Sequence, residues 1–324
     1  RLTTDYMRPM LQRSSAPRNS VSLLRSISFS ARQGEITAVL SSEYGERRTL
    51  IDLIVGRRKR GVFAGDINLH GRMSGDTNTS LAMNSALVPR KTLFCPGMTY
   101  EKMLHYSARL RMSILPDGRW QAVSDVTLER RVHEVLKLMN LWKVRHDVLP
   151  EDTPERGEVA GALRRLSIAI EVIHYPPLVV IDDPVLGLEP AVAFTIMQAL
   201  QNLARRGHIV ILAMPAPSPQ ILAKIDRLVV IGKGLTIYSS PPQEMKEFFC
   251  SPDVGYELKR GVDLMDWMRD IATGVERPIN HRGNHELHEL QEKFECSTFF
   301  EGQLSKGDTS DSISSFHPKL FKYW

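Results

Sequence analysis

Short apolar runs alternate with segments of helical periodicity along most of the chain. Runs rich in β-branched residues predict strands at residues 36–40, 86–88, 178–181, 209–214 and 228–231. Apolar residues recur at helical spacing over residues 128–139 and again over residues 192–203. Strands that alternate with helices predict an α/β fold, with a mainly parallel sheet and helices on both of its faces.

Changes in this pattern divide the chain into three parts. Residues 1–20 are interpreted as an N-terminal extension and residues 21–279 as one domain. Within that domain, residues from about 98 to 173 contain no convincing strand, which predicts an inserted helical subdomain. The pattern weakens after Pro241, and residues 280–324 are polar and rich in His, Glu, Ser and Gly. This composition predicts a loosely ordered polar linker.

Composition sets few limits on function. The 324 residues carry a net charge of +5 and are 42% hydrophobic and 24% charged, as in ordinary globular proteins. The dense basic run GRRKRG at residues 56–61 is interpreted as a solvated turn, with contact to phosphates of nucleic acid or lipid as the alternative. No run of about 18 apolar residues occurs, so no membrane-spanning helix is predicted within these residues.

Cysteines and histidines offer no metal site. The three cysteines, Cys95, Cys250 and Cys296, fit no metal or disulfide spacing, which suggests a reducing compartment. Histidines at 281, 285 and 288 lack ligand partners at suitable spacing and are interpreted as part of a solvated helix or linker. The chain begins at Arg1 with neither Met nor a signal-peptide pattern, so we expect it to be a piece of a longer protein.

Two segments have the layout of a nucleotide site. In PPLVVIDDPVLGLEP, residues 176–190, a buried strand ends in Asp182 and Asp183. In nucleotide hydrolases the first such acid holds Mg²⁺ or its waters, and the second orients the attacking water. The alternative is that both acids cap the turn after the strand. In LSSEYGERRTLIDLIVGRR, residues 40–58, a strand, a tight loop and a helix follow one another as in a phosphate-binding loop. The predicted loop, however, contains one glycine, Gly45, and no lysine.

Six ordered blocks of sequence point to a family: LLRSISFSARQGEITAVL, TLIDLIVGRR, GDINLHGR, MTYEKMLHYSARLRM, RRLSIAIEVIHYPPLVVIDDP and GLEP. Over roughly residues 21–271 the chain resembles the nucleotide-binding domain of ABC transporters, most closely the G subfamily of White-type and pleiotropic-drug-resistance exporters. The resemblance implies a P-loop NTPase (RecA-like) core of the ABC ATPase type with an inserted helical subdomain. It also implies ATP and Mg²⁺ as cofactors, and ATP hydrolysis coupled to export of a lipid, sterol or drug.

The resemblance implies partners as well. A second nucleotide-binding domain is expected, in a homodimer or heterodimer whose two composite sites each pair one phosphate loop with the other domain's signature. A transmembrane domain is expected after Trp324 in the full-length chain, which would put this domain on the cytoplasmic side of a membrane. No nucleic-acid partner is expected.

The family's nucleotide-binding positions fall on residues that differ from the family pattern. They are Ser41, Ser42, Glu43, Tyr44, Gly45, Glu46, Arg47, Arg48, Thr49, Leu50 and Arg90. Ser41 and Glu46 stand where glycines let backbone N–H groups approach the phosphates. Arg47 replaces the lysine that reaches the phosphates. Arg48 replaces the hydroxyl that coordinates Mg²⁺, although Thr49 is adjacent.

The remaining site positions of the family are also altered. Arg90 stands at the glutamine that senses the γ-phosphate and Mg²⁺, and Pro215 at the switch histidine. Asp183 takes the place of the catalytic glutamate, whereas Asp182 keeps the Mg²⁺ position. The signature VSGGE falls on Glu158 followed by Val159, Ala160, Gly161 and Ala162, so only Gly161 survives.

Three hypotheses follow from these changes. The first is a degenerate nucleotide-binding domain with weak or no ATP hydrolysis, acting by dimerisation. The second is a working but slow ATPase of the same transporter class, in which Arg47 and Asp183 substitute for the usual residues. The third is a soluble pseudo-ATPase interaction module. Under the family reading, Asp182 should end a central parallel strand beside the loop at residues 41–49.

Overall fold

The computed structural model describes residues 23–57, 67–69, 72–73, 82, 84–113, 122–151, 157–278, 287–297, 299 and 313–316. The chain forms two compact units. Unit 1 comprises residues 1–32, 37–78 and 213–324, and unit 2 comprises residues 33–36 and 79–212. The predicted extension at 1–20 and most of the basic run at 56–61 lie outside the described residues.

Unit 2 is built on buried strands. These are β5 (Ser85–Val88), β6 (Leu178–Asp182) and β7 (Ile209–Met214). They are neighbours in the sheet in that order, and the last two residues of β7 belong to unit 1. β5 and β6 run parallel, with Val88 beside Ile181. All three strands are buried along their whole length. Their nearly continuous apolar sequences are those of parallel strands covered on both faces.

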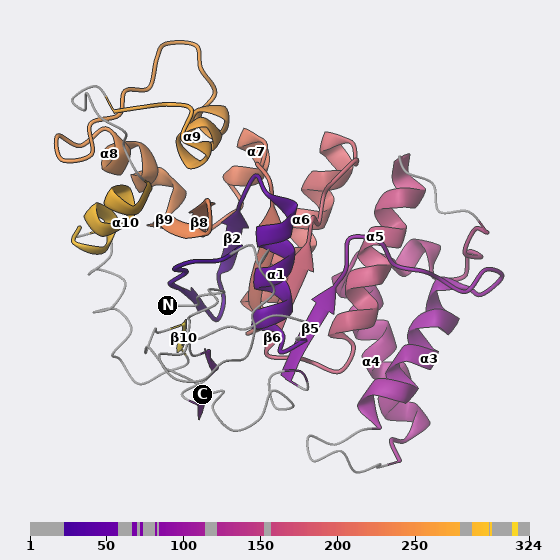
Figure 1. Ribbon diagram of the computed structural model, residues 1–324. Helices are drawn as coiled ribbons and strands as arrows, with labels where there is room; N and C mark the ends of the chain where they lie inside the picture. Colours follow the sequence, from indigo (N-terminus) through magenta and orange to yellow (C-terminus); the bar gives the residue numbers. More distant parts are fainter. Residues whose placement is uncertain are drawn as a thin grey trace, which may run out of the picture. The chain divides into compact units, whose positions relative to one another are not determined.

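Helices make up the rest of unit 2. They are α3 (Tyr100–Met112), α4 (Asp125–Leu138), η1 (Trp142–Val144), α5 (Gly157–Val172) and α6 (Pro190–Arg205). Figure 1 shows α3, α4 and α5 packed side by side. α4 begins after Ser124, whose hydroxyl accepts the N–H of Thr127 at 3.3 Å, and it buries the apolar face that the sequence predicts. The division of residues 98–173 into a separate subdomain stays a prediction.

Unit 1 holds the remaining elements. Its strands are β1 (Phe29–Arg32), β2 (Ile36–Leu40, whose first residue belongs to unit 2), β3 (Asn68–Leu69), β4 (Arg72–Met73), β8 (Arg227–Gly232), β9 (Leu235–Ser240) and β10 (Ile313–Phe316). Its helices are α1 (Tyr44–Ile54), α7 (Pro219–Leu222), η2 (Pro242–Glu244), α8 (Met245–Phe249), α9 (Leu264–Thr273) and α10 (Leu287–Glu295). β2 is parallel to β8, and β8 is antiparallel to β9. β1 pairs with β10, and β3 with β4, both antiparallel.

The residues after Pro241 are more ordered than their sequence pattern indicates. α9 begins after Asp263, whose carboxylate accepts the N–H of Met265 at 2.8 Å, and α10 packs on β9. Aromatic rings join these elements, since Phe248 lies 5.8 Å from Tyr238 and 5.4 Å from Phe294 between ring centroids. Residues 287–295 are therefore a packed helix rather than loose linker, because their few apolar residues fall on one face.

The predicted fold class is confirmed: the protein is a mixed α/β protein whose main sheet is dominated by parallel strands. The five predicted strands correspond to β2, β5, β6, β7 and β8, with ends that differ by no more than one residue. β9 was not predicted. It follows β8 through a two-residue turn at Lys233 and Gly234, both with positive φ, which is the hairpin turn that matches strand twist. Within the described residues, no helix has the length and apolar character needed to cross a bilayer.

Candidate functional site

The phosphate-loop segment of unit 1 follows a fully buried strand. β2 runs into Ser41, and α1 begins at Tyr44. The Ser41 hydroxyl accepts the N–H of Glu43 at 3.1 Å and donates to the Glu46 carboxylate at 2.5 Å. Glu43 itself caps α1 without a side-chain hydrogen bond. The Ser41 hydroxyl therefore fixes the turn that leads into α1 and ties it to Glu46 in the first turn of the helix.

Glu46 and Arg47 are turned into the protein rather than toward solvent. Their exposed fractions are 5% and 4%. Arg47 donates from Nη1 to the carbonyl oxygen of Ser41, and its guanidinium carbon lies 5.7 Å from the centre of the Tyr44 ring. Burial raises the pKa of the Glu46 carboxyl above its usual value of 4.5, although the bond from Ser41 acts in the opposite direction. Both charged side chains thus contact the loop that carries them.

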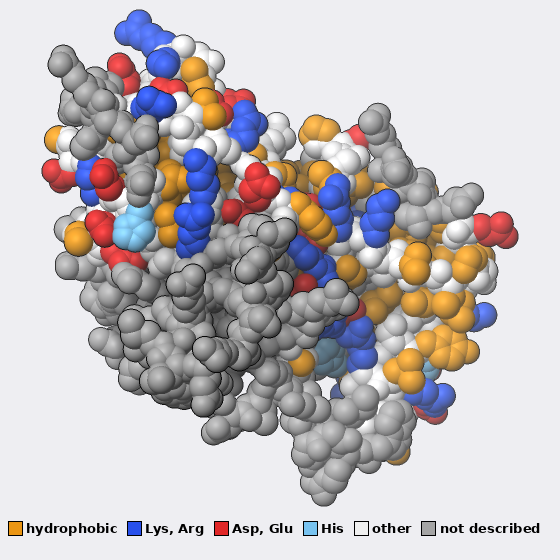
Figure 2. All heavy atoms as spheres, viewed as in Figure 1, with side chains coloured by type: hydrophobic (Ala, Val, Ile, Leu, Met, Phe, Trp, Pro, Cys, Tyr) orange, Lys and Arg blue, Asp and Glu red, His pale blue; other side chains and the backbone are white. Residues whose placement is uncertain are grey.

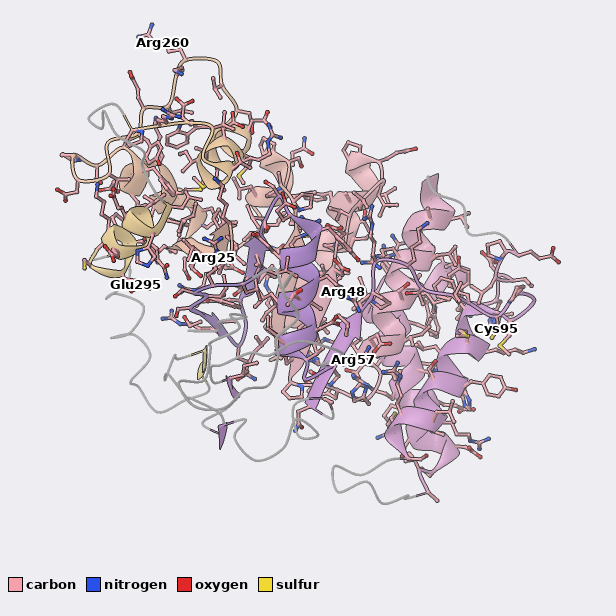
Figure 3. The ribbon with its side chains drawn as sticks, in the orientation of Figure 1. Arg25, Arg48, Arg57, Cys95, Arg260 and Glu295 are labelled. Carbon is pink, nitrogen blue, oxygen red and sulfur yellow. The ribbon has the colours of Figure 1, made fainter. Side chains whose placement is uncertain are left out.

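The next residues of α1 are engaged with the helix itself. Arg48 forms a double contact with Asp52 one turn later, from Nε at 3.2 Å and from Nη2 at 3.1 Å. Figure 3 shows Arg48 on α1 and Arg57 beyond the helix end. Thr49 is partly exposed and Leu50 is buried in the core.

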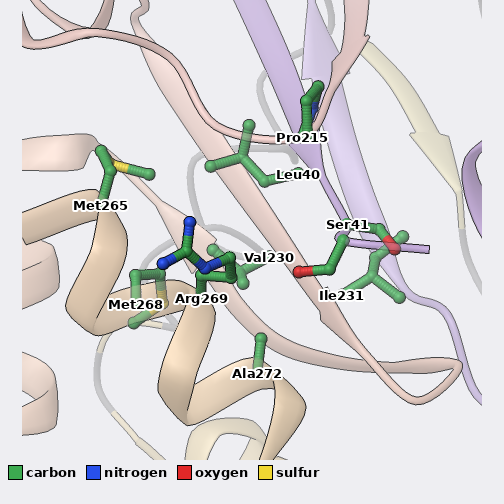
Figure 4. Close-up of a pocket in the computed structure, with 10 residues that line it drawn as sticks. Leu40, Ser41, Pro215, Val230, Ile231, Met265, Met268, Arg269 and Ala272 are labelled. Atoms are coloured by element: carbon green, nitrogen blue, oxygen red, sulfur yellow. The ribbon is translucent and has the colours of Figure 1, made fainter. Parts of the chain in front are cut away.

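A pocket in unit 1 brings the loop together with the switch position. Ser41, Ser42 and Pro215 line it, along with residues of β8 and of α9 (Figure 4). Arg269 of α9 also lines this pocket, and it pairs with Asp266 at 2.9 Å. Proline offers neither a side-chain donor nor a backbone N–H. The loop and the switch position are therefore neighbours, but Pro215 adds no hydrogen-bond donor to the pocket.

The acid pair lies in unit 2. Asp182 is the last residue of β6, as predicted, and its exposed fraction is 0%; that of Asp183 is 4%. Asp183 has φ of +48°, in the left-handed region that aspartate adopts more readily than most residues. Arg90 places its Nε 3.9 Å from a carboxylate oxygen of Asp183. The prediction that Asp182 lies beside the loop of unit 1 stays a prediction.

Arg164 of α5 ties the backbone of this region together. Its Nη1 donates to the carbonyl of Pro89 at 2.5 Å and to that of Arg90 at 3.3 Å. Nη2 donates to the carbonyl oxygens of Asp182 at 2.6 Å and Asp183 at 3.3 Å, and Nε to that of Pro184 at 3.3 Å. All five donors of the guanidinium are used on two separate chain segments.

The signature positions occupy the first turns of α5. Val159 is exposed, whereas Ala160, Gly161 and Ala162 are buried. A Cβ at Gly161 would meet the side chain of Val192 on α6 at 2.2 Å. The surviving glycine is therefore required for the close approach of α5 to α6.

Sequence reasoning missed Arg164. The signal was present, since helical spacing places Ala160, Gly161, Ser167 and Ile168 around it on one face of α5, and all four are small or apolar. A charged residue inside such a buried stripe needs partners. Burial lowers the pKa of Arg164 to about 10, while Asp182 and Asp183 act in the opposite direction, so the guanidinium stays charged at neutral pH.

Comparisons with known proteins connect these segments to a family. The chain is 30% identical over 270 residues to ABC transporter G family member 5 of Oryza sativa subsp. japonica, with 82% of this chain and 33% of that protein covered. It is 32% identical over 258 residues to ABC transporter G family member 20 of Arabidopsis thaliana, with 80% and 33% covered. The chain thus spans about a third of the length of these relatives. No family model matches it.

A solved structure described as the ATP binding subunit of an ABC transporter has the same fold. It superposes with a TM-score of 0.57 at 18% identity, over 79% of this chain and 95% of the other.

Proposed function

Because this chain is a homologue of ABC transporters of the G family over most of its length, we propose that it is a degenerate nucleotide-binding domain of such a transporter. In this role it binds Mg-ATP weakly or not at all, hydrolyses it at best slowly, and acts by pairing with a second nucleotide-binding domain. The transporter would export a lipid, sterol or drug, with this domain on the cytoplasmic side of the membrane.

The contacts of the loop carry the proposal. A phosphate loop binds a polyanion with backbone N–H groups and a lysine that point into an open cradle. In this chain the Glu46 carboxylate is held by Ser41, and Arg47 is directed to the carbonyl of Ser41. A buried carboxylate repels phosphate, and a guanidinium used within the loop is not directed at a ligand. These residues do not fit the triphosphate of ATP.

The family's Mg²⁺ position fits the ion no better. Oxygen ligands are what Mg²⁺ requires, and Arg48, at the position of the family hydroxyl, has none in its side chain and pairs with Asp52. In unit 2, Arg90 supplies a cation 3.9 Å from Asp183. No group of three or more His, Cys, Asp or Glu side chains suited to a metal occurs among the described residues. We therefore derive no step of hydrolysis through this site.

Exposed apolar side chains in unit 2 support a role in assembly. Leu93 is 95% exposed, and Tyr106 and Leu110 of α3 are 57% and 63% exposed. Figure 2 shows hydrophobic side chains gathered on the visible face of the part that carries α3 and α4. Large apolar side chains of this kind favour contact with another protein. We propose that a transmembrane domain of the same full-length chain covers them.

The test is a titration of the purified 324-residue chain with Mg-ATP. We expect binding weaker than about 1 mM, which corresponds to less than about 4 kcal/mol. The matched variant rebuilds the family loop with Ser41→Gly, Glu46→Gly, Arg47→Lys and Arg48→Ser. Its affinity should rise, because glycine freedom and a compact ammonium return together.

Hydrolysis by the rebuilt variant should stay at least about 100-fold below a turnover of about 1 s⁻¹, because Pro215 and Val159 offer no side-chain donor to the γ-phosphate and Arg90 still replaces the sensing glutamine. Phosphate release is the measurement, with the same loop combined with Asp183→Asn as the control. Micromolar binding by the wild-type chain that is lost in Arg47→Ala would favour a slow ATPase instead. Turnover near 1 s⁻¹ that disappears in the Asp183→Asn control would contradict degeneracy at both composite sites.

A further inference from the structure

The buried acid pair has two arginines of the same chain close to it, Arg164, which is buried, and Arg90, which is exposed. Asp182 and Asp183 have exposed fractions of 0% and 4%. Two carboxylates taken out of water require nearby positive charge or hydrogen-bond donors, because burial of an uncompensated ion costs several kcal/mol. In a nucleotide hydrolase a divalent cation supplies much of that charge.

Arg164 of α5 supplies one of the two positive charges, next to the backbone of the acid pair. Its guanidinium reaches the backbone carbonyls of both acids, at 2.6 and 3.3 Å, and also the carbonyls of Pro89 and Arg90. A divalent cation held by these acids would have to tolerate a fixed, charged guanidinium bound to the adjoining backbone. Arg164 therefore places a positive charge beside both acids and fixes the two segments to each other.

Arg90 supplies the second charge from the solvent side. Its Nε lies 3.9 Å from the Oδ2 of Asp183, and its side chain is 44% exposed, so it can be replaced without opening a cavity. Arg90 stands on one of the two segments that Arg164 holds, so the backbone contacts keep Arg90 and Asp183 close.

We propose that Arg90 and Arg164 take the place of the divalent cation at this acid pair, and that Arg90 is the residue that excludes the metal. The inference deepens the proposed function and rests on it, since it names what substitutes for Mg²⁺ in unit 2. The pair is balanced by the chain itself, so its geometry does not depend on nucleotide or metal.

Manganese binding to the 324-residue chain without nucleotide is the test, read from the electron paramagnetic resonance signal of free Mn²⁺. Wild type should bind Mn²⁺ no tighter than about 10 mM. Arg90→Gln, which removes the charge and adds an oxygen donor, should bind at least about 10-fold more tightly, because repulsion of a divalent ion by a guanidinium is removed. Arg90→Met should show part of this gain, and Arg90→Lys, which keeps the charge, should show none.

Two control variants test whether the gain in Mn²⁺ affinity comes from Arg90 and the acid pair. Arg109→Gln removes an exposed arginine that pairs with Asp125 at 2.7 Å and should leave Mn²⁺ binding at the wild-type level. Asp183→Asn added to Arg90→Gln should abolish the gain. Melting curves with 10 mM MnCl₂ and with EDTA should show a rise of about 2 °C for Arg90→Gln and no change for wild type.

Equal binding by wild type, Arg90→Gln and Arg90→Met would overturn the inference, as would tight Mn²⁺ binding by wild type that Asp183→Asn removes. Neither result depends on the Mg-ATP titration. A wild-type chain that binds Mg-ATP tightly in the loop would contradict the proposed function, whereas an unresponsive Arg90→Gln variant contradicts only the assignment of Arg90.

Discussion

The phosphate loop and the acid pair both follow a buried strand with charged residues, yet the charges are compensated differently. In the loop Ser41 contacts both Glu46 and Arg47 within six residues, and the backbone of Gly234 adds a hydrogen bond to Glu46. At the acid pair the arginine itself is distant in sequence: Arg164 is 18 residues from Asp182. The loop therefore makes most of these contacts within one short segment, whereas the acid pair depends on the packing of α5, β5 and β6 against one another.

This difference predicts different responses to mutation. A substitution in the loop should change local contacts and leave the rest of the protein in place. A substitution at Arg164 should disturb two chain segments at once, because its five donors reach both.

The largest effect is expected from Arg164→Met. Loss of the guanidinium leaves five carbonyl oxygens without this donor in a buried setting, so the free energy of unfolding should fall by about 3 to 5 kcal/mol. Chemical denaturation followed by fluorescence and circular dichroism is the measurement. Arg109→Met, at an exposed arginine of α3, should cost less than about 1 kcal/mol. Equal stability of the two variants would show that the contacts of Arg164 are not needed for folding.

A smaller effect is expected at Asp183, where the backbone is left-handed. Glutamate is less tolerant of φ near +48° than asparagine or aspartate, so Asp183→Glu should be about 1 kcal/mol less stable than Asp183→Asn. The substitution restores the family residue and is still expected to destabilise. Asp125→Glu, at a helical position of α4, should change stability by less than about 0.5 kcal/mol. A stable Asp183→Glu variant would mean that this turn can relax.

The smallest effect is expected in the loop, and it depends on pH. Burial raises the pKa of Glu46 in the folded protein, so the folded state binds its proton more tightly than the unfolded state does. The stability from this group is complete below the unfolded value of 4.5 and is lost as pH rises through the folded pKa. Glu46→Gln should therefore be more stable than wild type at pH 7, by up to about 1 kcal/mol, with a smaller difference at pH 4.

Denaturation at the two pH values measures this difference. Glu129→Gln, at an exposed residue of α4, is the control and should show no such gain. A Glu46→Gln variant that loses stability at pH 7 would mean that the bond from Ser41 outweighs the cost of burying the carboxylate.

Much of the fold could be predicted because periodicity reports burial directly. The strands β2, β5, β6, β7 and β8 are apolar runs, and α4 and α6 repeat apolar residues at helical spacing. α9 and the packing of α10 were not predicted, because their apolar residues are few and alternate along the sequence with charged residues, although they lie on one face of each helix. β9 was missed because its sequence, LTIYSS, contains as many polar as apolar side chains, although all six residues are buried.

The sequence by itself predicted which residues stand at the positions of the family's nucleotide site, including Arg47, Arg90, Asp183 and Pro215, and it predicted that Asp182 ends a strand. Only the tertiary structure decided how those charges are compensated. The partners of Arg164 are backbone carbonyl groups, which every residue has, so no residue type marks them in the sequence. Likewise, Gly161 matched a binding motif in the sequence, and packing alone revealed that Val192 requires a glycine there. A pattern of side chains can point to a site, but the distances between its charged groups are set by the packing of segments that are distant in sequence.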